Sequence, residues 1–169
     1  MTQEAHQGVN RDEKDERTGT QLLFENAILE IWRLSYASNS FNFPLYQEFE
    51  AEFDITRPEF VTLLCAAHTE SVYPYDIYAS TLLPKNSISR GLTRLEKKKL
   101  INRVADPVDK RRSIISLTEA GRELYDVLIA RALERQALVL GVLTKREREQ
   151  LTKLLLKVSL HVAENVNKV

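Results

Sequence analysis

The 169-residue chain has a single cysteine, Cys65, so no disulfide bond can form within it. Only five glycines and five prolines are present, which favours a mostly helical chain with few turns. No stretch reaches the roughly 18 apolar residues that a membrane-spanning helix needs, and the polar segment 1–20 lacks the apolar run of a secretion signal. Because unpaired thiols are typical of reducing compartments, we expect a soluble cytoplasmic protein with no membrane partner.

The sequence also lacks the motifs of common catalytic sites. There is no glycine-rich phosphate loop, no His-Glu-x-x-His, no nucleophile elbow and no Cys/His cluster with metal-ligand spacing. The three histidines, His6, His68 and His161, are scattered along the chain and do not suggest acid–base chemistry. We therefore expect that the protein is not an enzyme and that it has no metal site and no cofactor.

Net charge is absent as well, because 24 basic residues balance 24 acidic ones, yet the charges are segregated. Residues 21–84 have a net charge of −7, whereas residues 85–112 have a net charge of +7. A positive excess of this size in one short segment is typical of a surface that contacts phosphates. A solvated surface face would give the same count, so charge alone leaves both interpretations open.

Apolar residues at helical spacing predict helices along most of the chain. Segment 1–20 has no periodicity and is predicted to be a disordered tail. A helix is predicted from Gln21, with an interruption at Asn39–Pro44 before the pattern resumes. Thr56–Glu59 and Thr144–Glu147 have the form of capping boxes. In a capping box, the side chains of the first and fourth residues each accept a hydrogen bond from the backbone N–H of the other. Thr118 is the expected N-cap of a long helix that ends near Gly141.

In one segment the apolar residues no longer follow helical spacing, and the pattern there predicts a β-hairpin. Leu100–Ala105 and Ser113–Leu117 are short stretches with β-branched residues, separated by the polar loop 106–112. The predicted helix immediately before it, Pro84–Lys98, has Ile88, Leu92 and Leu95 on one face. The opposite face and its flanks combine arginine with small polar residues, namely Asn86, Ser89, Arg90, Thr93, Arg94 and Lys97. Arginine, asparagine and hydroxyl groups can hydrogen-bond to base edges, although an ordinary amphipathic surface helix would look similar.

The order of these elements favours DNA binding. A short helix, Pro74–Leu83, precedes the polar-faced helix, as in a helix-turn-helix, and a hairpin with a basic tip follows it. The tip has Lys110, Arg111 and Arg112, which can enter a minor groove. Asp109 is expected to hold the Arg111 guanidinium in one orientation through a charge-assisted pair.

These residues resemble a known family. The run from Asp106 to Gly121, with Lys85–Arg90, Leu95–Ile101 and Ile55–Phe60, is similar to the multiple-antibiotic-resistance regulator (MarR) family, in which the hairpin is called the wing. The resemblance covers about residues 20–165 and implies a mostly α fold with a small β-hairpin wing. It implies helical dimerisation regions at 21–55 and 119–169 that flank a winged helix-turn-helix lobe at 56–118. Three departures are Lys110, where arginine is frequent, the large residues Tyr78 and Leu82, and the interruption at 39–44.

The resemblance also implies which residues contact DNA. Asn86, Ser87, Ser89, Arg90 and Arg94 are expected to face the major groove, and Arg111 the minor groove. Together with the charge pattern, the predicted DNA-binding residues are Lys85, Asn86, Ser87, Ser89, Arg90, Arg94, Asp109, Lys110, Arg111 and Arg112. The expected function is a sequence-specific repressor that binds a pseudo-palindromic site in double-stranded DNA as a homodimer. The alternative is a winged-helix protein–protein adaptor, which lacks the steep salt dependence of DNA binding.

Regulators of this family are usually released from DNA by a small ligand or by thiol oxidation. A cavity for a planar or phenolic ligand is expected from aromatic residues, namely Trp32, Tyr36, Phe41, Phe43, Tyr46, His68, Tyr73 and Tyr75. Plain core packing is the alternative for each of them. Cys65 lies in an apolar helical run without a neighbouring base, so we expect a buried, inert thiol and a small-molecule effector rather than oxidation.

Overall fold

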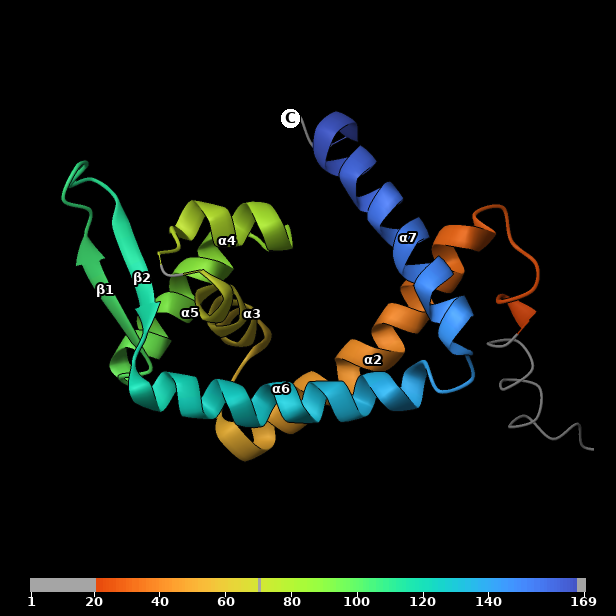
Figure 1. Cartoon of the computed structure of the whole chain (residues 1–169), viewed down its shortest axis with the longest axis horizontal. Helices are drawn as coiled ribbons and strands as arrows, with labels where there is room; N and C mark the ends of the chain where they lie inside the picture. Colours follow the sequence, from red (N-terminus) through yellow and green to blue (C-terminus); the bar gives the residue numbers. More distant parts are fainter. Residues whose placement is uncertain (1–20, 70, 167–169) are drawn as a thin grey trace, which may run out of the picture. The chain divides into compact units, whose positions relative to one another are not determined.

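The computed structural model describes residues 21–69 and 71–166, so the predicted disordered tail at 1–20 lies outside the described residues. The chain divides into two compact units, residues 1–40 and 41–169, which are described separately. Helices dominate, and the only sheet in the described residues is a two-stranded hairpin (Figure 1). The elements in chain order are α2 (Leu29–Phe53), α3 (Arg57–His68), α4 (Pro74–Thr81), α5 (Lys85–Lys97), β1 (Ile101–Ala105), β2 (Ser113–Leu117), α6 (Glu119–Val139), α7 (Lys145–His161) and the π-helical turn η1 (Val162–Val166).

Two sequence predictions about the first helix are wrong. The helix begins at Leu29 rather than at Gln21, because the Asn26 side chain accepts a hydrogen bond from the Ile28 N–H at 2.8 Å and stabilises a turn instead. The predicted interruption at 39–44 is also absent, and α2 is continuous through Pro44. A proline inside a helix costs about 3 kcal/mol. The next turns bury Leu45 and Phe49 completely, and burial of two such side chains offsets that cost.

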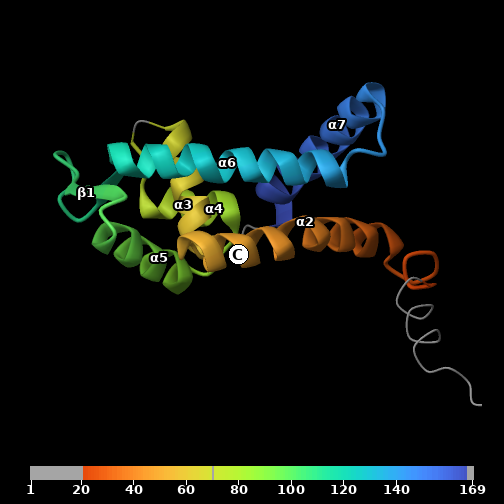
Figure 2. The same cartoon turned by 90° about the horizontal axis from the view of Figure 1, so that it is seen from below.

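The core of the second unit is built around α3. This helix lies between α5 and α6 (Figures 1 and 2) and contributes Phe60 and Leu63 to the core. Its neighbours contribute the fully buried side chains of Phe49 from α2 and Leu128 from α6. The α5 helix comes close to α3 at Gly91, where an added Cβ would lie 3.2 Å from the Cβ of Pro58. Close contact at this point fixes how α5 lies on α3.

The predicted helix caps are confirmed. Thr56 N–H donates to Glu59 Oε2 at 2.9 Å, and Thr144 N–H donates to Glu147 Oε2 at 2.7 Å, so both capping boxes form. The Thr118 hydroxyl accepts a hydrogen bond from the Gly121 N–H at 3.0 Å and caps α6. Each of these bonds satisfies a backbone or side-chain group that the first turn of a helix would otherwise leave unpaired.

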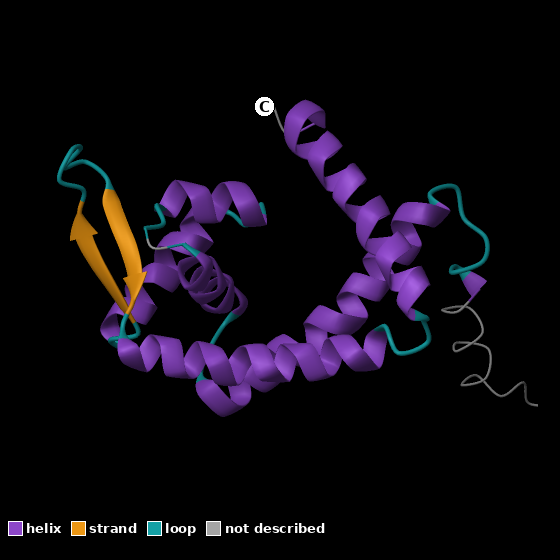
Figure 3. Cartoon of the chain, viewed as in Figure 1, coloured by secondary structure: helices purple, strands orange, loops and turns teal. Residues whose placement is uncertain are grey.

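The hairpin has the predicted position. β1 and β2 pair antiparallel, in register from Ile101 opposite Leu117 to Ala105 opposite Ser113. Val72, just before α4, forms two backbone hydrogen bonds with Ile115 and extends the ladder on the other side of β2. Figure 3 shows the loop between β1 and β2 at the far end of the hairpin from α6. We call residues 101–117 the wing.

α7 has an apolar face that is exposed in the described part of the chain. No residue of this helix is buried, and the exposed apolar side chains of the described residues include Leu154, Leu155 and Val158, which share one face of α7. In the described part of the chain, no helix is both long enough and apolar enough to cross a membrane.

Candidate nucleic-acid interface

α5 has a buried face and an exposed polar face. Ile88, Leu92 and Leu95 are at most 2% exposed, which confirms the predicted buried side. We call the exposed Asn86, Ser89, Arg90 and Thr93 the reading face, while Ser87 is half-buried. Pro84 is the N-cap, so the first turn of α5 begins directly after the connection from α4. Lys85 and Asn86 are exposed in that turn, where unpaired backbone N–H groups favour a phosphate.

The connection between α4 and α5 is tight. Leu82 caps α4 in the left-handed conformation, with φ of 55°, and its N–H donates to the Tyr78 carbonyl at 3.0 Å. This conformation is uncommon for a leucine, which explains why a small residue is usual at this place. The short turn holds α4 and α5 in the arrangement of a helix-turn-helix.

Arg94 does not belong to the reading face. Its guanidinium donates to Asp54 Oδ1 at 2.7 Å and to the fully buried Glu59 at 3.2 Å. Lys98 also binds Glu59, at 2.9 Å, and reaches Asp54. We call Asp54, Glu59, Arg94 and Lys98 the ion-pair cluster. It ties the C-terminal half of α5 to the start of α3, so Arg94 has a structural role, and its expected base contact stays a prediction.

The carboxylates of the ion-pair cluster are held in their charged form. Burial alone would raise the pKa of Glu59, but hydrogen bonds from Thr56 and the bond and charge of Lys98 outweigh burial, and the pKa is lowered. The hydrogen bond and charge of Lys98 also lower the pKa of the exposed Asp54. A buried carboxylate with four donors is therefore ionised at neutral pH and can keep two cations in place.

The tip of the wing is organised by Asp109, but not as predicted. Asp109 Oδ1 accepts a hydrogen bond from the backbone N–H of Arg111 at 3.0 Å, and its carbonyl accepts one from the Arg112 N–H at 2.8 Å. Asp109 thus shapes the turn rather than pairing with the Arg111 guanidinium. Lys110 and Arg111 are exposed on this turn and extend from the end of the hairpin.

The base of the wing contains a residue that sequence analysis did not select. Asp106 is only 5% exposed, and its Oδ1 accepts a hydrogen bond from Val108 N–H at 2.7 Å. The Tyr73 hydroxyl donates to Asp106 Oδ2 at 2.7 Å, which lowers the pKa of Asp106. Arg112, predicted to bind DNA, has its guanidinium carbon 3.7 Å from the centre of the Tyr73 ring. An aspartate before a proline is a turn signal that could have indicated this role.

The predicted aromatic cavity is not assembled from the residues of the second unit. Phe43 is 66% exposed, whereas Tyr46 packs with Phe49 and Phe60. Tyr73 lies at the wing, and His68 is exposed beside Tyr125. Trp32 and Tyr36 belong to the first unit, where both are exposed, and Phe41 is half-buried at the start of the second unit.

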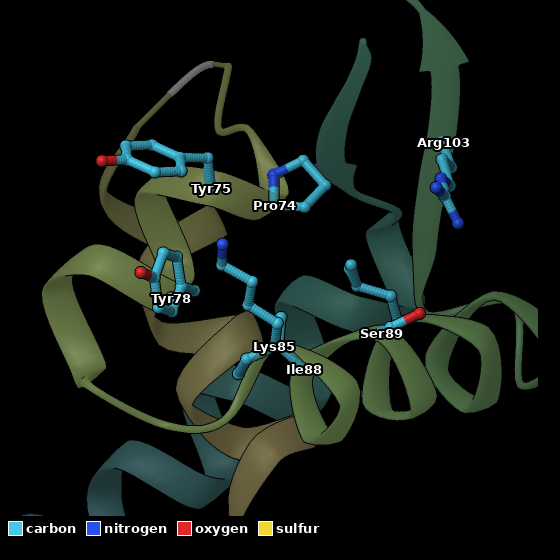
Figure 4. Close-up of a pocket in the computed structure, with 8 residues that line it drawn as sticks. Pro74, Tyr75, Tyr78, Lys85, Ile88, Ser89 and Arg103 are labelled. Carbon is cyan, nitrogen blue, oxygen red and sulfur yellow. The ribbon is translucent and has the colours of Figure 1, made fainter. Parts of the chain in front are cut away.

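A different pocket lies between α4, α5 and β1. Its volume is about 290 Å³, and Figure 4 shows Tyr75 and Tyr78 on one side and Arg103 on the other. Lys85 extends into it, with its ammonium 4.8 Å from the centre of the Tyr78 ring. Aromatic walls with two cations suit a planar anion. The three-residue spacing of Tyr75 and Tyr78, which puts both on one helical face, could have indicated this pocket. The sequence analysis included only Tyr75 among the aromatic residues of its expected cavity.

The prediction of a buried Cys65 is wrong, since the thiol is half-buried, with its sulfur 3.7 Å from the Ser80 hydroxyl oxygen. No cation or histidine is among the groups that the structure places at this sulfur. The packing of α3 against α4 thus leaves part of the thiol accessible, because Ser80 is itself on the exposed side of α4.

The helix-turn-helix α4–α5 with the hairpin that follows it defines a winged helix-turn-helix domain. Residues 55–113 match the model of the MarR family. Over this range the chain therefore has a winged helix-turn-helix domain that matches the MarR family.

Comparisons with individual proteins agree with this classification. The HTH-type transcriptional repressor NicR of Pseudomonas putida is 28% identical over 67% of this chain and 72% of its own length. A MarR-family regulator from Listeria monocytogenes, solved with a 26mer DNA, has a TM-score of 0.72 at 22% identity over 84% of this chain and 92% of its own. BpsR of Bordetella bronchiseptica has a TM-score of 0.66 at 24% identity, over 80% of this chain and 95% of its own. These two structures show the shared fold.

Proposed function

We propose that the chain is a cytoplasmic repressor that binds duplex DNA as a homodimer and is released by a small aromatic ligand. The observation that carries the proposal is the reading face of α5. It presents Asn86, Ser89 and Arg90 to solvent beside a wing with a basic tip, while the apolar side of the helix is fully packed. Arginine can bind guanine through two hydrogen bonds and asparagine can bind adenine in the same way, so this face fits a major groove.

The basic residues fall into two groups with different proposed roles. Lys85 at the start of α5 and Lys110 and Arg111 at the wing tip are exposed and fit phosphate or minor-groove contacts. Arg94 forms ion pairs with two carboxylates, and the Arg112 guanidinium stacks on the Tyr73 ring. The proposed DNA contacts are therefore Lys85, Asn86, Ser87, Ser89, Arg90, Lys110 and Arg111.

A homodimer is supported by the apolar face of α7. Leu154, Leu155 and Val158 share one face of this helix and are between 37% and 63% exposed, although such residues are normally buried. A second copy of the chain would cover them, and two-fold symmetry would present two reading faces to one duplex. The operator is then a pseudo-palindrome with half-sites about one helical turn apart. A protein–protein adaptor would need neither the reading face nor the basic tip.

The Arg90→Ala variant tests this function. We expect its affinity for a duplex selected from random sequences to fall about tenfold to a hundredfold, because one bidentate base contact contributes roughly 1–3 kcal/mol. Fluorescence anisotropy at several salt concentrations measures the affinity, and sedimentation of the complex is expected to show two chains per duplex. Lys145→Ala, which removes an exposed cation of α7, is the control. Equal affinities of wild type and Arg90→Ala would contradict the assignment.

The pocket at Tyr78 is the proposed effector site. BpsR is regulated in DNA binding by 6-hydroxynicotinic acid, a planar aromatic acid. This compound is therefore our probe, and we expect it to bind the chain and lower its affinity for DNA, since Lys85 and Arg103 line the pocket. 6-Hydroxynicotinamide, in which an uncharged amide replaces the carboxylate, is the matched control. Calorimetry that found equal binding of both compounds, or binding of neither, would reject an anion-selective site.

A further inference from the structure

Tyr73 lies where the helix-turn-helix meets the wing. The residue before it, Val72, pairs with Ile115 of β2 through two backbone hydrogen bonds of 2.9 and 3.3 Å. Tyr73 itself is the N-cap of α4, and its N–H donates to Asp76 Oδ2 in the first turn at 3.1 Å. The backbone of Tyr73 therefore belongs to the helix-turn-helix, while the preceding residue belongs to the hairpin ladder.

The Tyr73 side chain makes two further contacts, and both are with the wing. Its hydroxyl donates to Asp106, the buried residue at which β1 passes into the tip loop. Asp106 also accepts hydrogen bonds from Val108 and Asp109 N–H groups, and its own N–H donates to the Arg112 carbonyl at 3.0 Å. The phenol thus binds the residue that organises the entry to the tip loop.

The second contact is with the exit from that loop. The Arg112 guanidinium lies over the Tyr73 ring, with its carbon 3.7 Å from the ring centre. Arginine stacks well on aromatic faces because its charge is delocalised over a plane. One side chain therefore holds both ends of the segment that carries Lys110 and Arg111, and it holds them against the first turn of α4.

We infer that Tyr73 is a positioning residue for DNA binding. By fixing the base of the wing to α4, it sets the place of Lys110 and Arg111 relative to the reading face of α5. Tyr73 and Arg112 contact no DNA themselves and act through the wing tip. This inference rests on the proposed function, because it supposes that α5 and the wing bind one duplex.

A double-mutant cycle between Tyr73 and the wing tip tests the inference. Tyr73→Ala removes no charge, yet we expect it to weaken DNA binding by at least about tenfold. We also expect the slope of log affinity against log salt to fall by up to about 2, since each lost phosphate contact contributes about 0.9. In a chain that already has Lys110→Ala and Arg111→Ala, adding Tyr73→Ala is expected to have little further effect.

The control cycle pairs Tyr73→Ala with Arg90→Ala, whose effects are expected to add because Arg90 belongs to α5. Arg112→Gln is expected to reproduce the loss, and Tyr73→Phe, which keeps the ring under Arg112, to retain part of the affinity. Circular dichroism checks that each variant is folded. If Tyr73→Ala folds poorly, Arg112→Gln and Tyr73→Phe test the same contacts. Unchanged binding in the folded variants, or effects that add to those of the wing tip, would overturn the inference. If the wild type itself does not bind duplex DNA at low salt concentration, the proposed function is contradicted rather than the role of Tyr73.

Discussion

Replacing Gly121 by alanine is expected to destabilise the folded chain by roughly 3 kcal/mol, even though alanine is the better helix former by about 1 kcal/mol. A Cβ at this position would lie 1.9 Å from the Leu100 carbonyl oxygen and 2.9 Å from its carbonyl carbon. That carbonyl accepts the Thr118 N–H at 3.1 Å, so it is fixed at the junction of the wing and α6. Because backbone atoms form the obstacle, no side chain can move aside.

Thermal unfolding followed by circular dichroism measures this effect, and we expect the Tm to fall by about 10 °C. Gly91→Ala is the matched comparison, since its Cβ would meet the Pro58 side chain at 3.2 Å and needs only a small shift. It is expected to cost much less than Gly121→Ala. Equal stability of Gly121→Ala and the wild type would show that α6 and the wing can separate more easily than their contacts imply.

Features that depend on neighbours a few residues apart could be predicted from the sequence. Thr56 and Glu59 are three residues apart, so their capping box forms from local geometry alone. The same reason explains the correct N-cap at Thr118 and the correct bounds of α5 and the wing. The polar side of α5 followed from helical spacing, because Ile88, Leu92 and Leu95 must face the core together.

Features that depend on distant residues could not be predicted. Arg94 has the side chain of a base-reading residue, but Asp54 and Glu59 lie 40 and 35 positions before it, and only the packing of α5 on α3 brings them within reach. Tyr73 and Asp106 are separated by 33 positions for the same reason. Gly121 was part of the motif that indicated the family, yet the carbonyl that forbids a side chain there becomes visible only in three dimensions.

Glu59→Gln is expected to lower the free energy of unfolding by about 2–3 kcal/mol at neutral pH. Every group around this fully buried carboxylate is a donor: the Thr56 N–H and hydroxyl, the Arg94 guanidinium and the Lys98 ammonium. A glutamine would turn its own N–H groups toward these donors, and it would leave both cations without the charge that holds them. Urea unfolding at pH 7.5 measures the loss.

The difference between Glu59→Gln and the wild type is expected to depend on pH. In the folded chain the pKa of Glu59 lies below the 4.5 of an ordinary glutamate. The carboxylate therefore stabilises the fold fully above about pH 4.5, and this contribution disappears as the pH falls through the lower pKa of the folded state. Unfolding measured in steps from pH 7.5 to 3 is expected to show the two proteins converging at the acid end.

The Glu147→Gln variant distinguishes the contribution of a capping box to the free energy of unfolding from that of the ion pairs. Glu147 caps α7 through Thr144 as Glu59 caps α3 through Thr56, but Glu147 is exposed and forms no ion pair with a cation of the described residues. Its replacement is expected to cost far less, so the excess cost at Glu59 measures what burial and the ion pairs with Arg94 and Lys98 add together. Because Arg94 lies in α5 and Lys98 is the C-cap of that helix, a large excess means that one buried carboxylate holds the reading face in place. Equal costs for the two substitutions would mean that the carboxylate acts only as a helix cap.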